Sequence, residues 1–387
     1  MSKKKINLEK GMVIKKETKL GLVKPSIKIK QLLNSEKSDR IQKKYDELAG
    51  KNLGKLLKKN SSIWYFEGGC LCYNPTLQKV FEIHGDIYKK WVKLGGVKWG
   101  IPNTDEEACH DKVGRVNHFN GNQASIFWHP RTGANSIQGG IYSRWKELGY
   151  EQSYLGYPNS DEADFPDGGR VNSFEKGGIY WWSDTGAIDA KEVEVHYTGL
   201  ICFKTTGEGP FKKDSDEPYV ILNVASPFDT RSFRSKEYGG VDANTSRPDL
   251  IQIYKGAPNG LIISTFLFEA DHGDKDKYQA EITKAFELAH KAGTMALKLI
   301  PVVGKVIAAV AGPLIQSFVP EIGKALTRVF GFGDDLIGRQ NIVLTAKQML
   351  LLAKKHQNST LMNVGFKFQT DELRGHSARY RVYFGIV

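Results

Sequence analysis

An internal repeat in the first half of this chain constrains its fold more than any other feature. Three kinds of segment recur at offsets of 53 to 56 residues. They are residues 85–88 (GDIY) and 139–142 (GGIY), residues 99–102 (WGIP) and 155–158 (LGYP), and residues 114–117 and 169–172 (GRVN in both). So many matching positions at a nearly constant offset are not expected by chance. Such a period indicates stacked units that share one core.

Each unit is predicted to contain a short helix, a turn and a β-hairpin. Ile87, Trp91 and Leu94 follow the spacing of an apolar helix face, and Gly95 fits a C-terminal cap. Asn-Gly at residues 120–121 lies between two β-prone runs, which is a strong hairpin signal. A leading half-unit begins near residue 66. We therefore predict a tandem-repeat β domain over residues 61–190.

The two turn tetrapeptides, with the Gly-Arg and Gly-Ala pairs that follow them, resemble the LGFP repeat. That repeat is named for its Leu-Gly-Phe-Pro turn, and the resemblance covers about residues 64–190. It implies an extracellular or cell-wall-associated bacterial protein that binds envelope glycans. The third turn position departs from the family pattern, which we expect to affect packing.

Aromatic and acidic residues of the repeats indicate where a polysaccharide could bind. Aromatic rings present flat apolar faces to sugars, and carboxylates accept hydrogen bonds from hydroxyl groups. Trp91 and Trp145 lie on the apolar helix stripe, so we expect them in the core. Of two adjacent tryptophans on a strand, one must point outward. The candidate glycan-binding residues are Trp128, Tyr180, Trp181, Trp182, Asp105 and Asp161. The alternative for the acids is that they only cap turns.

The second half, residues 191–387, is predicted to be a β-sandwich that carries a helical insertion. Runs of alternating or continuous apolar residues mark the strands. They are residues 193–204, 219–225, 250–254, 261–269, 341–344, 361–369 and 378–387. The whole chain is therefore expected to be mainly β, with a repeat module followed by a sandwich.

Clusters of acids lie at the ends of several predicted strands. Calcium prefers six to eight oxygen ligands from flexible loops, and these segments offer carboxylates. The order of the clusters resembles the C-two domain family, a β-sandwich whose acidic loops bind calcium and then phospholipid. The resemblance implies calcium ligands at Asp214, Asp216, Asp271, Asp274 and Asp335. Glu217 and Gly273 depart from the family pattern, and the alternative is that these acids only shape turns.

The expected helical insertion covers residues 280–332. Within residues 299–319 the single charge is Lys305, and Gly304, Gly312 and Pro313 interrupt the apolar run. The length suits one membrane span, but the breaks favour a hairpin of two short helices. The hairpin is expected either to enter an anionic membrane or to pack on the sandwich. The candidate membrane-insertion residues are Leu299, Val302, Val303, Ile307, Leu314, Ile315 and Phe318.

Charge is concentrated at the N-terminus. Residues 1–60 hold 17 Lys, one Arg and six acids, so this arm alone carries the net charge of +12 of the chain. We expect a basic arm that is flexible or helical. Because the remainder is neutral, it lacks the basic surface that nucleic-acid binding requires.

Several classes of protein are excluded by the motifs that the sequence lacks. No phosphate loop, nucleophile elbow, zinc-protease helix or dinucleotide fingerprint is present, so we do not expect an enzyme. Four cysteines at this length indicate buried thiols. The basic start has no apolar stretch after it, so export is expected without a Sec-type signal peptide.

The sequence thus predicts a secreted or injected bacterial binding protein, located outside the cell or in the envelope and cytoplasmic before release. The repeats would recognise a polysaccharide or envelope glycan, and the C-terminal domain would associate with a membrane as a toxin does. One alternative is a purely adhesive carbohydrate-binding module with no membrane step. The other is a nucleic-acid binder that uses the basic arm.

Overall fold

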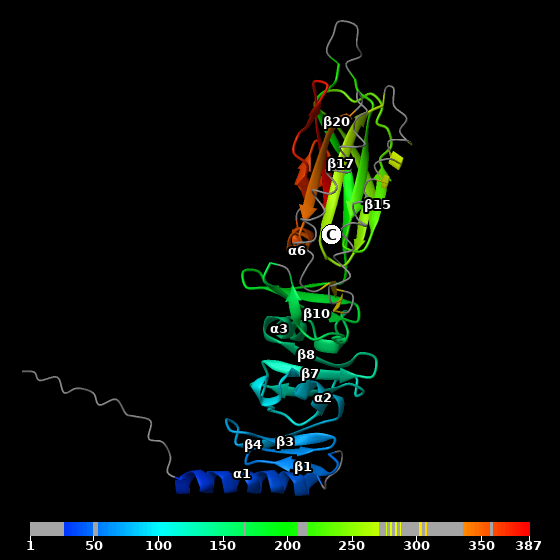
Figure 1. Ribbon diagram of the computed structural model, residues 1–387. Coiled ribbons are helices and arrows are strands. Elements are labelled where there is room, and N and C mark those ends of the chain that lie inside the picture. The colour runs from blue at the N-terminus through cyan, green and yellow to red at the C-terminus, as the bar shows by residue number, and fades with distance from the viewer. Residues whose placement is uncertain are drawn as a thin grey trace, which may run out of the picture.

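The chain forms a column of stacked sheets that ends in a sandwich (Figure 1). The computed structural model describes residues 27–48, 53–165, 167–207, 215–270, 336–356 and 359–387, with short pieces between residues 276 and 307. Within these ranges, antiparallel strands are the main regular structure, so the prediction of a mainly β chain is confirmed.

The column contains three four-stranded antiparallel sheets, and the strands of each follow one another in chain order. The first sheet holds β1 (Leu56–Lys59), β2 (Ile63–Phe66), β3 (Gly69–Asn74) and β4 (Lys79–His84). The second holds β5 (Glu107–Ala108), β6 (Arg115–Phe119), β7 (Ala124–His129) and β8 (Gly133–Gln138). The third holds β9 (Ala163–Phe165), β10 (Gly169–Phe174), β11 (Gly177–Trp182) and β12 (Gly186–Ala190).

A helix packs on each sheet of the column. The helices are α1 (Ile27–Leu48), α2 (Gly85–Leu94) and α3 (Gly139–Glu147), and the short turns η1 (Gly96–Lys98) and η2 (Tyr150–Gln152) follow the last two. Helix α2 ends at Gly95, whose φ of 116° is left-handed, so the predicted glycine cap is confirmed. Helix α1 belongs to the predicted basic arm. Its Ile41 is buried and its Tyr45 ring stacks on Phe66, with centroids 5.4 Å apart.

One buried tryptophan in α2 and one in α3 connect each of these helices to the turn that follows it. Trp91 Nε1 donates to the carbonyl of Gly100 at 2.9 Å, and Trp145 Nε1 donates to the carbonyl of Gly156 at 3.2 Å. Both indoles lie in the apolar cores between sheets. The prediction that these two tryptophans are core residues is confirmed. The glycine of each turn tetrapeptide thus marks where the chain folds back onto its own helix.

The sandwich packs two antiparallel sheets face to face. One sheet has the order β16 (Thr245–Gly256), β13 (Val193–Lys204), β25 (Ala378–Ile386) and β23 (Phe368–Gln369), with β24 (Leu373–Gly375) also paired to β25. The other has the order β15 (Thr230–Arg234), β14 (Pro218–Ala225), β17 (Leu261–Glu269) and β20 (Leu336–Leu344). Their facing side chains form one apolar core.

The sandwich meets the column at the end where the chain enters and leaves it (Figure 1). Backbone hydrogen bonds of 2.8 and 2.9 Å join Glu194, at the start of β13, to the C-terminal Val387. Helix α6 (Ala346–Lys354) also lies at this end, and it was missed from the sequence. It begins at a capping box in which Thr345 and Gln348 exchange hydrogen bonds. The hairpin β21 (Ser359–Leu361) and β22 (Val364–Phe366) follows it.

The predicted helical insertion is described in part. Val302–Val303 (β18) and Val306–Ile307 (β19) pair as two short antiparallel strands, so the helix predicted for Val302, Val303 and Ile307 is wrong. Their β-branched side chains favour extended backbone. Leu299, Leu314, Ile315 and Phe318 lie outside the described residues. Among the helices that are described, none has both the length and the apolar character that crossing a membrane requires.

Candidate functional site

The aromatic run of β11 divides between the two faces of the last repeat sheet. Tyr180 and Trp182 are only 1% and 2% exposed, because they pack with Ala346 and Leu350 of α6 under the sandwich. The prediction that these two side chains bind glycan is therefore wrong. Trp181, between them in sequence, is half-buried and packs on the opposite side.

A groove of about 340 Å³ opens beside Trp181. Its lining comes from the second hairpin, the start of α3 and the third sheet. We call it the Trp181 groove, and it is lined by Asn120, Gln123, Ala124, Gln138, Gly139, Gly140, Ile141, Glu162, Arg170 and Trp181. Three of these residues carry side-chain amides, which both donate and accept hydrogen bonds.

Gly140 lets the indole of Trp181 lie directly against α3. A Cβ atom on residue 140 would stand 2.6 Å from both Cδ1 and Nε1 of Trp181, which is too close for any other residue without a shift of the ring. Within the described part of the chain, no group accepts a hydrogen bond from this indole N–H. The groove therefore presents a flat apolar face with one uncommitted donor at its edge.

An arginine is held next to this indole. Arg170 and Trp181 are cross-strand partners in β10 and β11. Arg170 Nε donates to Glu162 Oε1 at 2.8 Å, and Nη1 donates to Asp164. The guanidinium is thus fixed in position, and its Nη2 has no acceptor among the described residues. Charged and apolar recognition elements meet at one wall of the groove.

The preceding unit has a different arrangement at the corresponding position. Trp128 replaces Trp181 and Asp86 replaces Gly140, and Trp128 Nε1 donates to Asp86 Oδ2 at 3.2 Å. Asp86 also accepts from Lys89 at 2.9 Å, and this bond is the largest cause of the lowered pKa of its carboxyl group, with Trp128 contributing further. The predicted glycan residue Trp128 is partly buried, as Trp181 is, but its indole donor is already used.

The acids predicted as glycan ligands instead join neighbouring units. Asp105 Oδ1 accepts from the backbone N–H of Glu82 at 2.9 Å, and Asp161 Oδ1 accepts from that of Ser136 at 2.9 Å. Their second oxygens accept from Lys44 at 2.6 Å and from Lys90 at 2.7 Å. These contacts are structural, and Asp161 does not line the Trp181 groove.

Two buried asparagines complete these junctions. Asn117 Nδ2 donates to the carbonyl of Glu82 at 3.0 Å, and Asn172 Nδ2 donates to that of Ser136 at 2.9 Å. One aspartate and one asparagine of each unit thus hold both backbone groups of a single residue in the preceding sheet. We call this pair of contacts the junction clamp.

The residues of the groove that sequence reasoning missed are Gly140, Arg170 and the three side-chain amides. A signal for Gly140 was present. Residues 86 and 140 occupy the same position of the repeat, yet one is an aspartate and the other a glycine. Differences between copies of a repeat are where a unit can acquire a site that its neighbour lacks.

The described part of the predicted calcium site is also structural. Asp216 is 2% exposed, and its carboxylate accepts from Thr206 N–H at 3.0 Å, Thr206 Oγ1 at 2.7 Å and Tyr380 Oη at 2.5 Å. The prediction that Asp216 binds calcium is wrong, because protein donors already occupy its oxygens. Asp214, Asp271, Asp274 and Asp335 lie outside the described residues. No group of three or more metal-binding side chains occurs in the described ranges.

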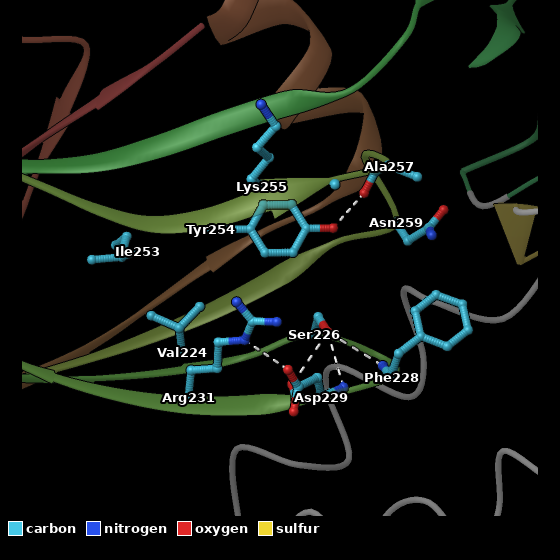
Figure 2. A pocket seen from close by; sticks show the side chains of 11 residues that line it. Val224, Ser226, Phe228, Asp229, Arg231, Ile253, Tyr254, Lys255, Ala257 and Asn259 are labelled. Atoms are coloured by element: carbon cyan, nitrogen blue, oxygen red, sulfur yellow. Dashed lines mark hydrogen bonds and ion pairs between the residues drawn. The ribbon is translucent and has the colours of Figure 1, made fainter. Parts of the chain in front are cut away.

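A second depression, of about 320 Å³, lies on the sandwich between the edge strands β15 and β16 (Figure 2). Its floor is apolar, with Val224 and Ile253. Figure 2 shows Arg231 paired with Asp229, at 2.8 Å, and Tyr254 Oη donating to the carbonyl of Ala257, at 2.5 Å. We take the Trp181 groove as the candidate site because it lies in the repeat domain and contains Trp181, one of the predicted glycan-binding residues.

Comparison with known proteins supports the repeat domain. No curated protein matches this chain. One similar solved structure is an extracellular domain from B. thetaiotaomicron, from a protein described as a one component system, at 11% identity and a TM-score of 0.12. The match covers 59% of this chain and 30% of that chain, and it is too weak to assign a fold. The LGFP repeat family model matches residues 100–153 and 155–194, so the repeats predicted from the sequence are confirmed over these residues.

Proposed function

We propose that this chain is a cell-envelope-associated binding protein whose repeat column recognises an envelope glycan through the Trp181 groove. The observation that carries the proposal is the half-buried indole of Trp181, whose N–H has no acceptor among the described residues and which lies beside a fixed guanidinium. Sugar-binding sites combine an aromatic platform with a few polar groups of fixed orientation. The LGFP match favours the same location, because that repeat suggests association with the cell envelope.

Binding explains the groove better than hydrolysis does. Glycoside hydrolysis generally uses two carboxyl groups that flank the scissile bond. Glu162 is the one carboxylate among the lining residues, and it is held by Arg170 at 2.8 Å. A single carboxylate cannot supply both the acid and the base or nucleophile of that reaction, so the groove suits binding.

The adhesive alternative, with no membrane step, is favoured over a membrane-perturbing function by one observation. The C-two resemblance implied calcium at Asp216, whose oxygens are filled by Thr206 and Tyr380. We therefore propose that the sandwich acts as a rigid module joined to the column. Flotation with anionic vesicles, with and without calcium, tests this. Co-flotation in either condition would revive the membrane function.

The glycan proposal is tested by co-sedimentation with insoluble bacterial cell walls. Trp181→Ala is expected to lower retention at least about 10-fold, which corresponds to about 1.4 kcal/mol. Trp128→Ala is the matched control, because it removes the same indole from the preceding unit. Equal retention of both variants, or no retention of the unmodified chain, would contradict the proposal. Thermal unfolding of each variant separates lost binding from lost folding.

A further inference from the structure

The two repeat copies differ in which group accepts a hydrogen bond from the indole N–H of the strand tryptophan, Trp128 in the first copy and Trp181 in the second. In the first copy it is a protein carboxylate, since Asp86 Oδ2 accepts from Trp128 Nε1 at 3.2 Å. Asp86 lies in the first turn of α2, where the helix dipole favours a negative charge. The fold thus already holds a carboxylate between a helix start and an indole N–H.

In the second copy, none of the described residues supplies such an acceptor. Residue 140 is glycine, and no described group accepts from Trp181 Nε1. Arg170 Nη2 on the same wall is likewise without an acceptor in the described part of the chain. The first turn of α3, through Gly139, Gly140 and Ile141, completes the lining. Beside the amides of Gln123 and Gln138, which can donate or accept, the wall thus offers two donors without an acceptor among the described residues, Trp181 Nε1 and Arg170 Nη2.

We propose that the Trp181 groove selects sugars that carry a carboxylate, which supplies to Trp181 and Arg170 the acceptor that Asp86 supplies in the preceding unit. This inference rests on the proposed glycan-binding function and names its ligand class: an acidic polysaccharide. The sugar ring stacks on the indole face, and its hydroxyl groups reach the amides of Gln123 and Gln138.

The charges around the groove do not by themselves attract an anion. The lining has two charged side chains, Glu162 and Arg170. Arg170 Nε lies 2.8 Å from Glu162 and its Nη1 pairs with Asp164, so one positive charge is shared by two carboxylates before a ligand arrives. The other polar lining residues, Asn120, Gln123 and Gln138, are neutral. Selectivity for a carboxylate therefore comes from the positions of the donors rather than from a net positive field.

The test uses one probe in two chemical forms. Purified bacterial cell-wall polysaccharide is prepared in its native form and after reduction of its carboxyl groups to alcohols. The unmodified chain is expected to bind the native form at least about 10-fold more tightly. Trp181→Phe keeps the aromatic platform but removes the donor, so it is expected to bind both forms equally and weakly.

Exchange of the differing residue between the copies gives the sharper result. Gly140→Asp installs the internal carboxylate that the first copy carries, and is expected to abolish the preference for the native form. Because any Cβ at residue 140 shifts the Trp181 ring, Gly140→Ala is the control, and it is expected to weaken binding but to keep the preference. Asp86→Gly is expected to raise the number of sites for acidic polysaccharide from one to two. Equal affinity of the unmodified chain for both forms would overturn this inference and leave the proposed function standing. Binding of neither form would count against both.

Discussion

The column and the sandwich reach stability in different ways. In the column, each core joins residues that are close in sequence, as where Trp91 packs with Ile63 and Phe119. In the sandwich, the core joins segments that are far apart in sequence, since β13 at residues 193–204 lies beside β25 at residues 378–386. The column is therefore modular, whereas the sandwich forms only when distant segments meet. This difference also determines how far the effect of a substitution spreads in each region.

The largest expected effect is at the boundary between the two regions. Trp182→Ala removes a buried indole from the contact between the third sheet and α6, and is expected to lower the free energy of unfolding by about 3–5 kcal/mol. Trp181→Ala, one residue away, is expected to cost less, because that side chain is only partly buried. Chemical denaturation measures both. Equal losses would show that the boundary is not a shared core.

A smaller effect is expected inside the column, at the junction clamps. Asn172→Ala leaves the carbonyls of Ser136 and Ser160 without their side-chain donor in a buried place, at a cost of about 1–3 kcal/mol. Asn117→Ala makes the same change at the preceding junction. Because the column is modular, hydrogen exchange should rise at the altered junction alone. Faster exchange throughout the sandwich would mean that the two regions unfold as one unit.

The smallest expected effect is on the pH dependence of stability, and it is expected at the first junction but not at the second. His84 Nδ1 lies 2.7 Å from Glu82, and this hydrogen bond is the largest cause of the raised pKa of His84. A raised folded-state pKa stabilises the fold at low pH, and the gain is lost as pH rises through that pKa. The second junction has Gln138 at the equivalent position, which does not titrate.

We therefore expect the free energy of unfolding to fall by no more than about 1 kcal/mol between about pH 5.5 and pH 8.5 through this residue. His84→Gln should remove that part of the pH dependence. Denaturation of both forms at the two pH values gives the difference. A pH dependence unchanged by the substitution would assign it to other groups.

The same contrast explains what the sequence could predict. The repeat, the Gly95 cap and the buried Trp91 and Trp145 depend on neighbours within one or two units, so local patterns were sufficient. Which face of β11 points outward depends on α6, which lies about 165 residues further along the chain. The C-two resemblance implies calcium at Asp216, and the hydrogen bond from Tyr380, 164 residues away, cannot be predicted from local sequence. The Thr345 capping box was a local signal that was overlooked.

Hydroxyl-radical footprinting of the chain bound to cell-wall polysaccharide tests the central claim most directly. It reports the solvent exposure of single tryptophans, so both repeat copies are read in one experiment. We predict that polysaccharide protects Trp181 from oxidation while Trp128 reacts as it does in the free chain. A complex that forms with Trp181 still fully reactive would contradict the assignment of the groove as the glycan-binding site.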